Sequence, residues 1–195
     1  MEKFTVHTGV ALPLKQTNVD TDQIIPSTFL KRISRTGFQD ALFADLRTDE
    51  TFPLDNPRYA GASVLVAGSD FGTGSSREHA VWALMDHGFK VVLSPKFADI
   101  FRGNCGKAGL VAARLDQTDV NDIWSAIDAT PGLQLTVNLI DQTVTCVDRK
   151  YTFDIDTYVK WRLLEGLDDI DLTQLAEADI QSFEARRPPF LPTVF

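Results

Sequence analysis

Long apolar runs and excess positive charge are both missing from this chain of 195 residues. No apolar run approaches the roughly 20 residues that a membrane-spanning helix requires, and the first residues, MEKFTVHTG, lack the apolar core of a signal peptide. The formal net charge is −8, which argues against nucleic acid or an anionic membrane as a partner. We therefore expect a cytoplasmic protein that binds neither nucleic acid nor a membrane.

Cysteine is also scarce. Only Cys105 and Cys146 occur, and neither belongs to a cluster with the spacing of metal ligands. In a cytoplasmic protein such a pair is more typical of two reduced, partly buried thiols than of a disulfide. Because an iron–sulfur cluster needs several thiolates from one site, we expect this chain to bind neither a cluster nor another metal.

The composition is sufficient for a full core, with 44% hydrophobic and 24% charged residues. The simplest organisation is one α/β domain over residues 1–155, followed by a helical extension over residues 156–195 that packs on the same domain.

The stretch from residue 63 to residue 88 reads SVLVAGSDFGTGSSREHAVWALMDHG. Its apolar run at 64–66, rich in β-branched residues, predicts a strand, and Gly72 and Gly74 predict a turn. Apolar residues at helical spacing from Ala80 then predict a helix. The stretch is therefore expected to form a strand, a glycine loop and a helix, around which the rest of the chain is organised.

The predicted helix has well-marked ends. Ser75 followed three residues later by Glu78 matches a capping box, and Gly88 matches a left-handed stop. Such a start points backbone N–H groups and the positive end of the helix dipole into the loop, beside Arg77. The loop is therefore predicted to hold an anion, with the hydroxyls of Ser75 and Ser76 in it.

Several interpretations of this loop compete. The simplest is that the glycines turn the chain and the serines cap the helix. A P-loop would need Lys after Gly74, a dinucleotide fingerprint would need Gly where Arg77 stands, and the Gly-x-Ser-x-Gly elbow of serine hydrolases is absent. Beside the capping role there remains an anion site with a candidate serine base and an arginine clamp. The two roles conflict, because the Oγ of Ser75 would be partly occupied if it capped the helix. Ser76 is the alternative capping residue.

A second motif, NVDTDQIIP at residues 18–26, places Asp20 and Asp22 two residues apart. The pair could serve as a general acid and base or as half of a divalent-metal site. The alternative that we favour is an Asx-type turn, in which these side chains satisfy loop N–H groups before Ile24 and Ile25 enter the core. We expect this turn to lie against the active-site cleft, and the roles of the two carboxylates stay open.

The next segment, STFLKRISRTGF, concentrates positive charge in a chain that is acidic overall. It is either a solvated basic face near a subunit contact or a substrate-recognition loop. In the second case a cation would bind a carboxylate and apolar groups would contact an alkyl chain. The cations are Lys31, Arg32 and Arg35, and the interleaved apolar residues are Phe29, Leu30 and Ile33.

Elsewhere the pattern predicts strands separated by helices, and hence a parallel or mixed sheet covered by helices. Ligands of such sheets bind outside the carboxyl ends of the strands, where the glycine loop lies. The further expected strands are 89–94, 110–113, 133–139, 143–147 and 151–155. The expected helices are 39–46, one beginning near Pro95, 119–129, 157–165 and 175–185.

Three other parts of the chain carry structural expectations. Phe4–Leu14 is expected to lie at an edge or in a hairpin, with Pro13 ending it. Residues 38–60 are expected to form a surface connection, and RRPPFLPTVF at 186–195 a frayed tail or a segment lying against a partner. None of the histidines is expected to be catalytic: His7 is expected to have a structural or solvent-facing role, His79 to support the site or pack, and His87 to interact with the helix dipole.

Two motifs together carry a resemblance to a known family. GSDFGTGSSREHA at 68–80 and NVDTDQIIP at 18–26 resemble the small subunit of 3-isopropylmalate dehydratase, which is similar in turn to the mobile swivel domain of aconitase. The resemblance extends from Phe4 to about Phe190. It implies a swivelling β/β/α domain of the α/β class, with a parallel or mixed sheet core covered by helices.

The resemblance also implies which residues act. Ser75 would be the general base, with Ser76 and Arg77 in the same catalytic site and Arg77 binding a substrate carboxylate in bidentate fashion. In the family, the loop that sorts isopropyl from carboxylated substrates falls in the basic segment. The substrate-binding candidates are therefore Arg77, Gly74, Phe29, Leu30, Lys31 and Arg32.

The activity implied is that of a hydro-lyase subunit, active only with a large subunit that carries a [4Fe-4S] cluster. The two subunits would interconvert 2-isopropylmalate and 3-isopropylmalate through 2-isopropylmaleate, in leucine biosynthesis. Two alternatives stay open. One is the small subunit of homoaconitase or of another aconitase-like hydro-lyase, and the other is a non-catalytic carboxylate-binding module that kept the scaffold.

Overall fold

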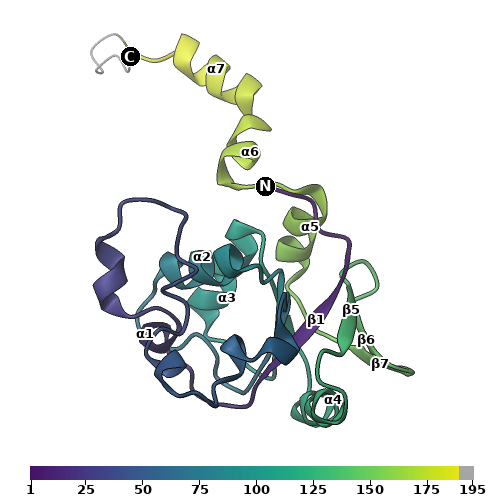
Figure 1. Ribbon diagram of the computed structural model, residues 1–195. Helices are drawn as coiled ribbons and strands as arrows, with labels where there is room; N and C mark the ends of the chain where they lie inside the picture. Colours follow the sequence, from purple (N-terminus) through teal and green to yellow (C-terminus); the bar gives the residue numbers. More distant parts are fainter. Residues whose placement is uncertain (189–195) are drawn as a thin grey trace.

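The body of the protein is a seven-stranded sheet (Figure 1), seen in a computed structural model that describes residues 1–188. The strand order is β4-β3-β2-β1-β5-β6-β7. The pairs among β1 to β4 are parallel, whereas β5 pairs antiparallel with β1, and β6 and β7 continue antiparallel. The strands are β1 Val6–Leu14, β2 Val64–Ala67, β3 Val91–Ser94, β4 Val111–Arg114, β5 Gln134–Asn138, β6 Thr143–Cys146 and β7 Arg149–Thr152.

Helices cover this sheet, so the expected α/β class with a mixed sheet is confirmed. Short 3₁₀ helices occupy the long connection between β1 and β2. The α-helices are α1 Thr21–Ile24, α2 Glu78–His87, α3 Asp99–Ala108, α4 Gln117–Ala129, α5 Thr157–Glu165, α6 Asp169–Gln174 and α7 Glu177–Ala185.

The two faces of the parallel strands belong to different layers. Leu65 and Val92 pack with α1, α2 and α3, whereas Val64, Val66 and Val91 pack with α4 and with β5 to β7. All five side chains are fully buried. Because both faces are covered, the segments 64–67, 91–93 and 111–113 are unbroken apolar runs rather than alternating patterns.

The sheet curls until its far ends meet. The N–H of Arg114, at the end of β4, donates to the carbonyl oxygen of Asp154 at 3.0 Å, and the N–H of Asp154 donates to the carbonyl oxygen of Arg114 at 2.8 Å. Asp154 follows β7, so the segment beyond one edge strand bridges to the other edge strand. This junction fixes the start of α5 against α3.

The position expected for the first strand is wrong. β1 lies in the middle of the sheet, between β2 and β5, and Pro13 lies within it rather than at its end. Pro13 has no N–H to donate, and its nitrogen faces the β5 side of the strand, as the N–H of Ala11 does. Ala11 donates this N–H to the carbonyl oxygen of Leu133 at 2.9 Å. Because β5 does not reach as far as Pro13, no backbone hydrogen bond is lost there and the proline is tolerated.

The expectation of a surface connection over residues 38–60 is wrong in its first part, and the helix expected at 39–46 is absent. The segment forms turns, yet Phe38, Leu42 and Phe43 are fully buried. The N–H of Phe43 donates to the carbonyl oxygen of Ile24 at 2.8 Å, which ties the turns to α1. Single apolar side chains inserted from irregular backbone leave no helical period for the sequence to reveal.

Two expected boundaries also move. α3 begins at Asp99 rather than near Pro95, because the residues between them bond to the loop after β2. The N–H of Phe71 donates to the carbonyl oxygen of Lys96, and the N–H of Ala98 to that of Phe71, both at 3.0 Å. The last strand is β7, Arg149–Thr152, rather than 151–155, because a two-residue turn pairs its first residue with the last of β6.

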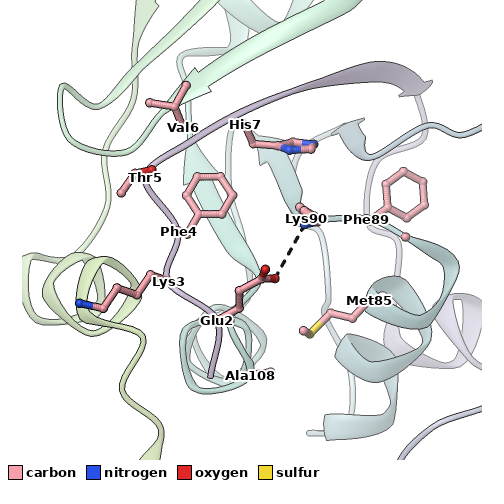
Figure 2. A pocket seen from close by; sticks show the side chains of 12 residues that line it. Glu2, Lys3, Phe4, Thr5, Val6, His7, Met85, Phe89, Lys90 and Ala108 are labelled. Carbon is pink, nitrogen blue, oxygen red and sulfur yellow. Dashed lines mark ion pairs between the residues drawn. The ribbon is translucent and has the colours of Figure 1, made fainter.

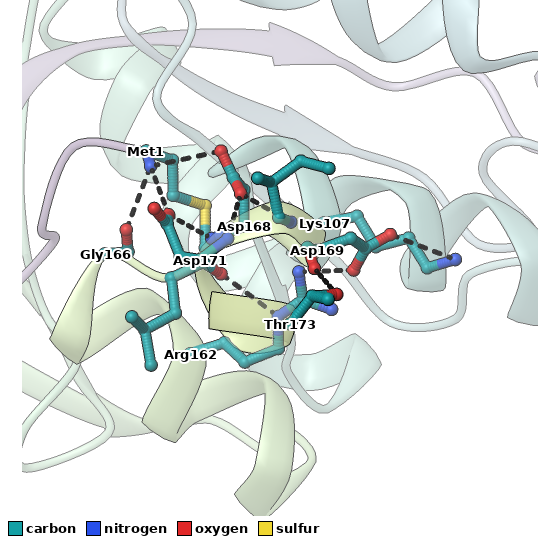
Figure 3. A network of polar contacts seen from close by, with 10 residues as sticks. Met1, Lys107, Arg162, Gly166, Asp168, Asp169, Asp171 and Thr173 are labelled. Atoms are coloured by element: carbon teal, nitrogen blue, oxygen red, sulfur yellow. Dashed lines mark hydrogen bonds and ion pairs between the residues drawn. The ribbon is translucent and has the colours of Figure 1, made fainter. Parts of the chain in front are cut away.

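The C-terminal helices 157–165 and 175–185 are found as α5 and α7. α5 packs on α3, and α6 is held by the polar network in Figure 3. In that network Arg162 pairs with Asp169 at 2.8 Å, and the Met1 amine donates to the carbonyl oxygen of Gly166 at 2.9 Å. α7 extends away from the body (Figure 1), and all its residues are exposed. Most of the expected tail, from residue 189 onward, lies outside the described residues.

Candidate active site

The glycine loop follows β2 at the carboxyl edge of the parallel strands, as expected. It lies directly against the segment after β1, because backbone bonds join the two. The N–H of Gly72 donates to the carbonyl oxygen of Val19 at 2.8 Å, and the N–H of Thr21 donates to that of Thr73 at 2.9 Å. The two sequence motifs are therefore side by side, and the aspartate turn lies against this loop.

Two glycines allow the loop to take this path. Gly72 and Gly74 have φ values of 79° and 87°, a region that side chains rarely adopt. At Gly72 a Cβ would also lie 2.3 Å from the ring of Phe101, so the backbone there touches the first turn of α3. The loop is clamped between α1 and α3.

The predicted capping box is wrong. α2 begins at Glu78, and its N-cap residue is Arg77, which has extended backbone and no side-chain capping bond. Ser75 is held by its backbone instead, since Thr21 Oγ1 donates to its carbonyl oxygen at 2.8 Å. Ser75 and Ser76 are both exposed, and neither hydroxyl bonds to another described residue. The start of α2 therefore presents N–H groups that no side chain caps, with two available hydroxyls beside them.

The two aspartates have different roles. Asp20 caps α1: its Oδ1 accepts the N–H of Gln23 at 2.8 Å, and Gln23 Oε1 accepts the N–H of Asp20 at 3.0 Å. This confirms the turn interpretation for Asp20. Asp22 instead forms an ion pair with Arg77. Within residues 1–188 there is no group of three or more His, Cys, Asp or Glu side chains that could hold a metal ion.

A pocket of about 230 Å³ opens at this loop. It is lined by the predicted residues Gly74, Ser75, Ser76 and Arg77, together with Thr21 and the start of α3. Sequence reasoning missed the α3 wall, because nothing local connects those residues to the loop. The side chain of Arg77 is 15% exposed, so its guanidinium is partly removed from water and its interactions with an anion are strengthened.

A roomier pocket of about 450 Å³ lies at the opposite, amino edge of the parallel strands (Figure 2). Lys90 reaches toward Glu2 there at 3.9 Å, and His7 Nε2 bonds Ser63 Oγ at 2.8 Å. Burial, and then the charge of Lys90, lower the pKa of His7, which favours its neutral form and fits the structural one of the two roles expected for it. The smaller pocket is the candidate active site, since ligands of parallel sheets bind at the carboxyl edge.

The candidate specificity residues do not line the pocket at the serines. Phe29 and Leu30, in a 3₁₀ turn over Ser27–Lys31, pack partly buried against the core, and Lys31 is exposed. Arg32 is engaged within its own loop: it pairs with Asp40 through two bonds of 2.7 Å and thereby lowers the pKa of that carboxyl.

The remaining histidines pack against aromatic rings. His79 lies 4.7 Å from the ring of Trp82 and 5.6 Å from that of Phe38, which fits its expected packing role. His87 stacks on Phe89, and burial lowers its pKa. The neutral form of His87 is therefore favoured, which weakens the expected interaction with the helix dipole.

Comparison with known proteins decides the family. The model described as Aconitase C-terminal domain matches residues 1–118, and the model LeuD_N matches residues 121–157. A 3-isopropylmalate dehydratase small subunit of Corynebacterium diphtheriae is 62% identical over 98% of both chains. One from Kocuria rhizophila is 61% identical over 99% of this chain and 97% of its own. The chain belongs to the 3-isopropylmalate dehydratase small-subunit family.

The fold of this dehydratase family agrees with the structure. A solved 3-isopropylmalate dehydratase from Methanocaldococcus jannaschii superimposes with a TM-score of 0.70 at 25% identity, covering 92% of this chain and 99% of its own. The expected family and the swivel-type α/β fold are thus confirmed. Within the described residues, no helix combines the length and apolarity needed to cross a membrane.

Proposed function

We propose that this chain is the small subunit of a 3-isopropylmalate dehydratase, a hydro-lyase that interconverts 2-isopropylmalate and 3-isopropylmalate through 2-isopropylmaleate in leucine biosynthesis. The observation that carries the proposal is the pocket in which Ser75, Ser76 and Arg77 meet at the start of α2. Relatives about 60% identical over nearly the whole chain bear the name of this enzyme, which supports the choice of substrate.

The thiols of this chain do not fit an iron–sulfur cluster. Cys105 and Cys146 are both buried, and they belong to the cores on opposite faces of the sheet. Burial raises the pKa of each thiol, which disfavours the thiolate that a cluster needs. The [4Fe-4S] cluster is therefore proposed for a large subunit, where it would supply the Lewis acid for the leaving hydroxyl.

This chain would contribute the base and one carboxylate clamp. As an alkoxide, Ser75 would take the proton from the carbon beside the one that carries the leaving hydroxyl, and so become a neutral hydroxyl. The electron pair of the broken C–H bond forms the double bond of 2-isopropylmaleate as that hydroxyl departs. Before the transfer, the alkoxide would be stabilised by the uncapped N–H groups of α2, by Ser76 and by Arg77. Arg77 also binds a substrate carboxylate with the donors that Asp22 leaves free.

The site would be incomplete without the partner. The serines are exposed, and an exposed site cannot exclude water or fix a dicarboxylate at both ends. The large subunit would cover this opening, with the loop at Phe29–Arg32 contacting the substrate side chain in the closed complex. Residues 1–155 would form the swivelling domain in the cytoplasm, and residues 156–195 its helical extension.

Reconstitution with an iron–sulfur large subunit tests the proposal. We expect absorbance from 2-isopropylmaleate when 2-isopropylmalate is added to the two subunits together, and none with either subunit alone. Homoaconitate and cis-aconitate are the matched substrate controls. Turnover of a tricarboxylate alone would assign the chain to a homoaconitase-type enzyme, and no turnover of any substrate would favour a non-catalytic module.

A further inference from the structure

The first turn of α3 forms a wall of the pocket at the serines, since residues 98–101 line that pocket together with the loop before α2. This wall is held against the glycine loop by two kinds of contact. Ala98 donates its N–H to the carbonyl oxygen of Phe71 at 3.0 Å, and the ring of Phe101 meets that of Phe71 edge-on, with ring centres 5.4 Å apart. The backbone of this turn therefore has a fixed position beside the serines.

Ile100 presents an apolar side chain on this wall. Ile100 is 60% exposed, whereas the neighbouring Phe101 is buried. Among the described residues of the lining, Ile100 is therefore the large apolar side chain that a ligand can contact. A single exposed apolar residue is ordinary on a protein surface. Here, however, it lines the pocket that holds the candidate base, where a bound ligand would cover it.

Asp99 adds a negative charge to the same wall. It is exposed, and within the described residues its carboxylate forms no hydrogen bond or ion pair. Lys96, three residues before it, pairs with Asp70 at 2.6 Å. Arg102, three residues after it, pairs with Asp154 at 3.3 Å. The wall thus combines an apolar side chain with a carboxylate that no neighbouring cation pairs with.

The proposed reaction brings the substrate side chain to this pocket. In 3-isopropylmalate the isopropyl group is attached to the carbon that would lose its proton to Ser75. Arg77 and the N–H groups of α2 favour the carboxylates of the substrate, and the loop at 29–32 does not line the pocket. The α3 wall is therefore the apolar surface that this chain offers there. An alkyl group on the reacting carbon can cover Ile100, whereas a carboxylated group meets the charge of Asp99.

We propose that the first turn of α3 selects substrates with an alkyl side chain, an inference that rests on the proposed function. Ile100 contacts the isopropyl group, and Asp99 repels a carboxylate at the same position. Specific sites often exclude a competitor by placing an unfavourable charge against it. The repulsion strengthens when the large subunit covers the pocket, because the removal of water lowers the local dielectric constant.

Kinetics of the enzyme reconstituted with its large subunit test the two residues separately. The substrates are 3-isopropylmalate and 3-methylmalate, with the products separated by liquid chromatography. The inhibitor is isocitrate, in which a carboxymethyl group replaces the isopropyl group of 3-isopropylmalate. Because Ile100 and Asp99 are both exposed, substitutions of them should fold like the parent.

Ile100→Ala should lower kcat/KM for 3-isopropylmalate about tenfold more than kcat/KM for 3-methylmalate, because the larger alkyl group loses more contact. The matched control is Ile140→Ala. Ile140 is 55% exposed and follows β5 at the amino edge of the parallel strands, so its substitution should leave the ratio unchanged. Equal losses for both substrates would indicate a contact with the large subunit instead, and would overturn the proposal, as would an unchanged ratio.

Asp99→Asn should lower the inhibition constant of isocitrate about tenfold and change KM for 3-isopropylmalate less than about twofold. The control Asp179→Asn also removes an acid from the first turn of a helix, but on α7, which extends away from the body (Figure 1). It should leave the inhibition constant unchanged.

The parent complex separates the two levels of the account. If it converts 3-isopropylmalate but Asp99→Asn keeps the parent inhibition constant, the selection by α3 is overturned and the proposed function stands. If the parent complex converts no isopropylmalate, the proposed function is overturned and this inference falls with it.

Discussion

Asp22 and Arg77 form an ion pair that joins the two sequence motifs across 55 positions of the chain. Asp22 lies on α1, which its neighbour Asp20 caps, and Arg77 is the N-cap residue of α2. The guanidinium at the candidate active site is therefore oriented by a helix that the distant motif builds.

Asp22→Asn should leave Arg77 less firmly oriented. We expect the KM for 2-isopropylmalate to rise and kcat/KM to fall about tenfold in the reconstituted enzyme, because an arginine clamp acts through its geometry. The matched control is Asp55→Asn, which breaks the pair with Arg47 away from the serine loop and should leave kcat/KM unchanged. Parent-like kinetics for Asp22→Asn would show that Asp22 does not position Arg77.

Gly72→Ala should destabilise the loop more than Gly74→Ala. Both residues have positive φ, and the left-handed conformation alone costs a non-glycine residue about 1–2 kcal/mol. Only Gly72 adds a collision, because its Cβ would lie 2.3 Å from the ring of Phe101, against 3.5 Å to the nearest atoms at Gly74. Urea unfolding should rank the variants in this order, and equal losses of unfolding free energy would contradict the clamp between loop and α3.

Sequence patterns predicted the features that are local or come in recognisable motifs. The β2–loop–α2 unit, the left-handed Gly88 at the end of α2 and the turn at Asp20 follow from such signals. Phe38 and Phe43 were missed because they enter the core singly from turns. The Asp22–Arg77 pair was missed because only the fold brings those motifs together, although their joint presence was itself the signal for the family.

The false capping box has the same origin. Ser75 and Glu78 have the right spacing, but spacing does not report where the chain leaves the extended conformation. The Thr21 hydrogen bond to the Ser75 carbonyl oxygen and the contact of Asp22 with Arg77 hold the loop extended up to Arg77. Tertiary contacts of α1 thus decide where α2 begins.

His87 should make folding stability depend on pH near neutrality. Burial, and then the charge of Arg47, lower its pKa below the ordinary value of 6.5, with Asp55 opposing. As the pH falls below 6.5, the unfolded chain takes up a proton that the folded chain resists, so the free energy of unfolding falls until the folded pKa is passed. His87→Gln should reduce the dependence of the unfolding free energy on pH between pH 7 and 5.

Denaturant unfolding at several pH values measures the effect. His7, whose pKa burial also lowers, should account for part of the remaining slope, so the control is His7→Gln alone and combined with His87→Gln. A pH slope that neither substitution changes would contradict burial as the cause.

The most direct test of the account is the turnover of Ser75→Ala in complex with the large subunit, measured by absorbance of 2-isopropylmaleate beside the affinity of the subunits for each other. Because Ser75 is exposed and its hydroxyl bonds to no other described residue, the substitution should change folding stability by less than about 0.5 kcal/mol and leave association intact. Loss of the base should lower kcat by about 10²-fold or more, whereas Asp55→Asn, which breaks only the pair with Arg47, should turn over like the parent. Parent-like turnover by Ser75→Ala in an intact complex would contradict the central claim.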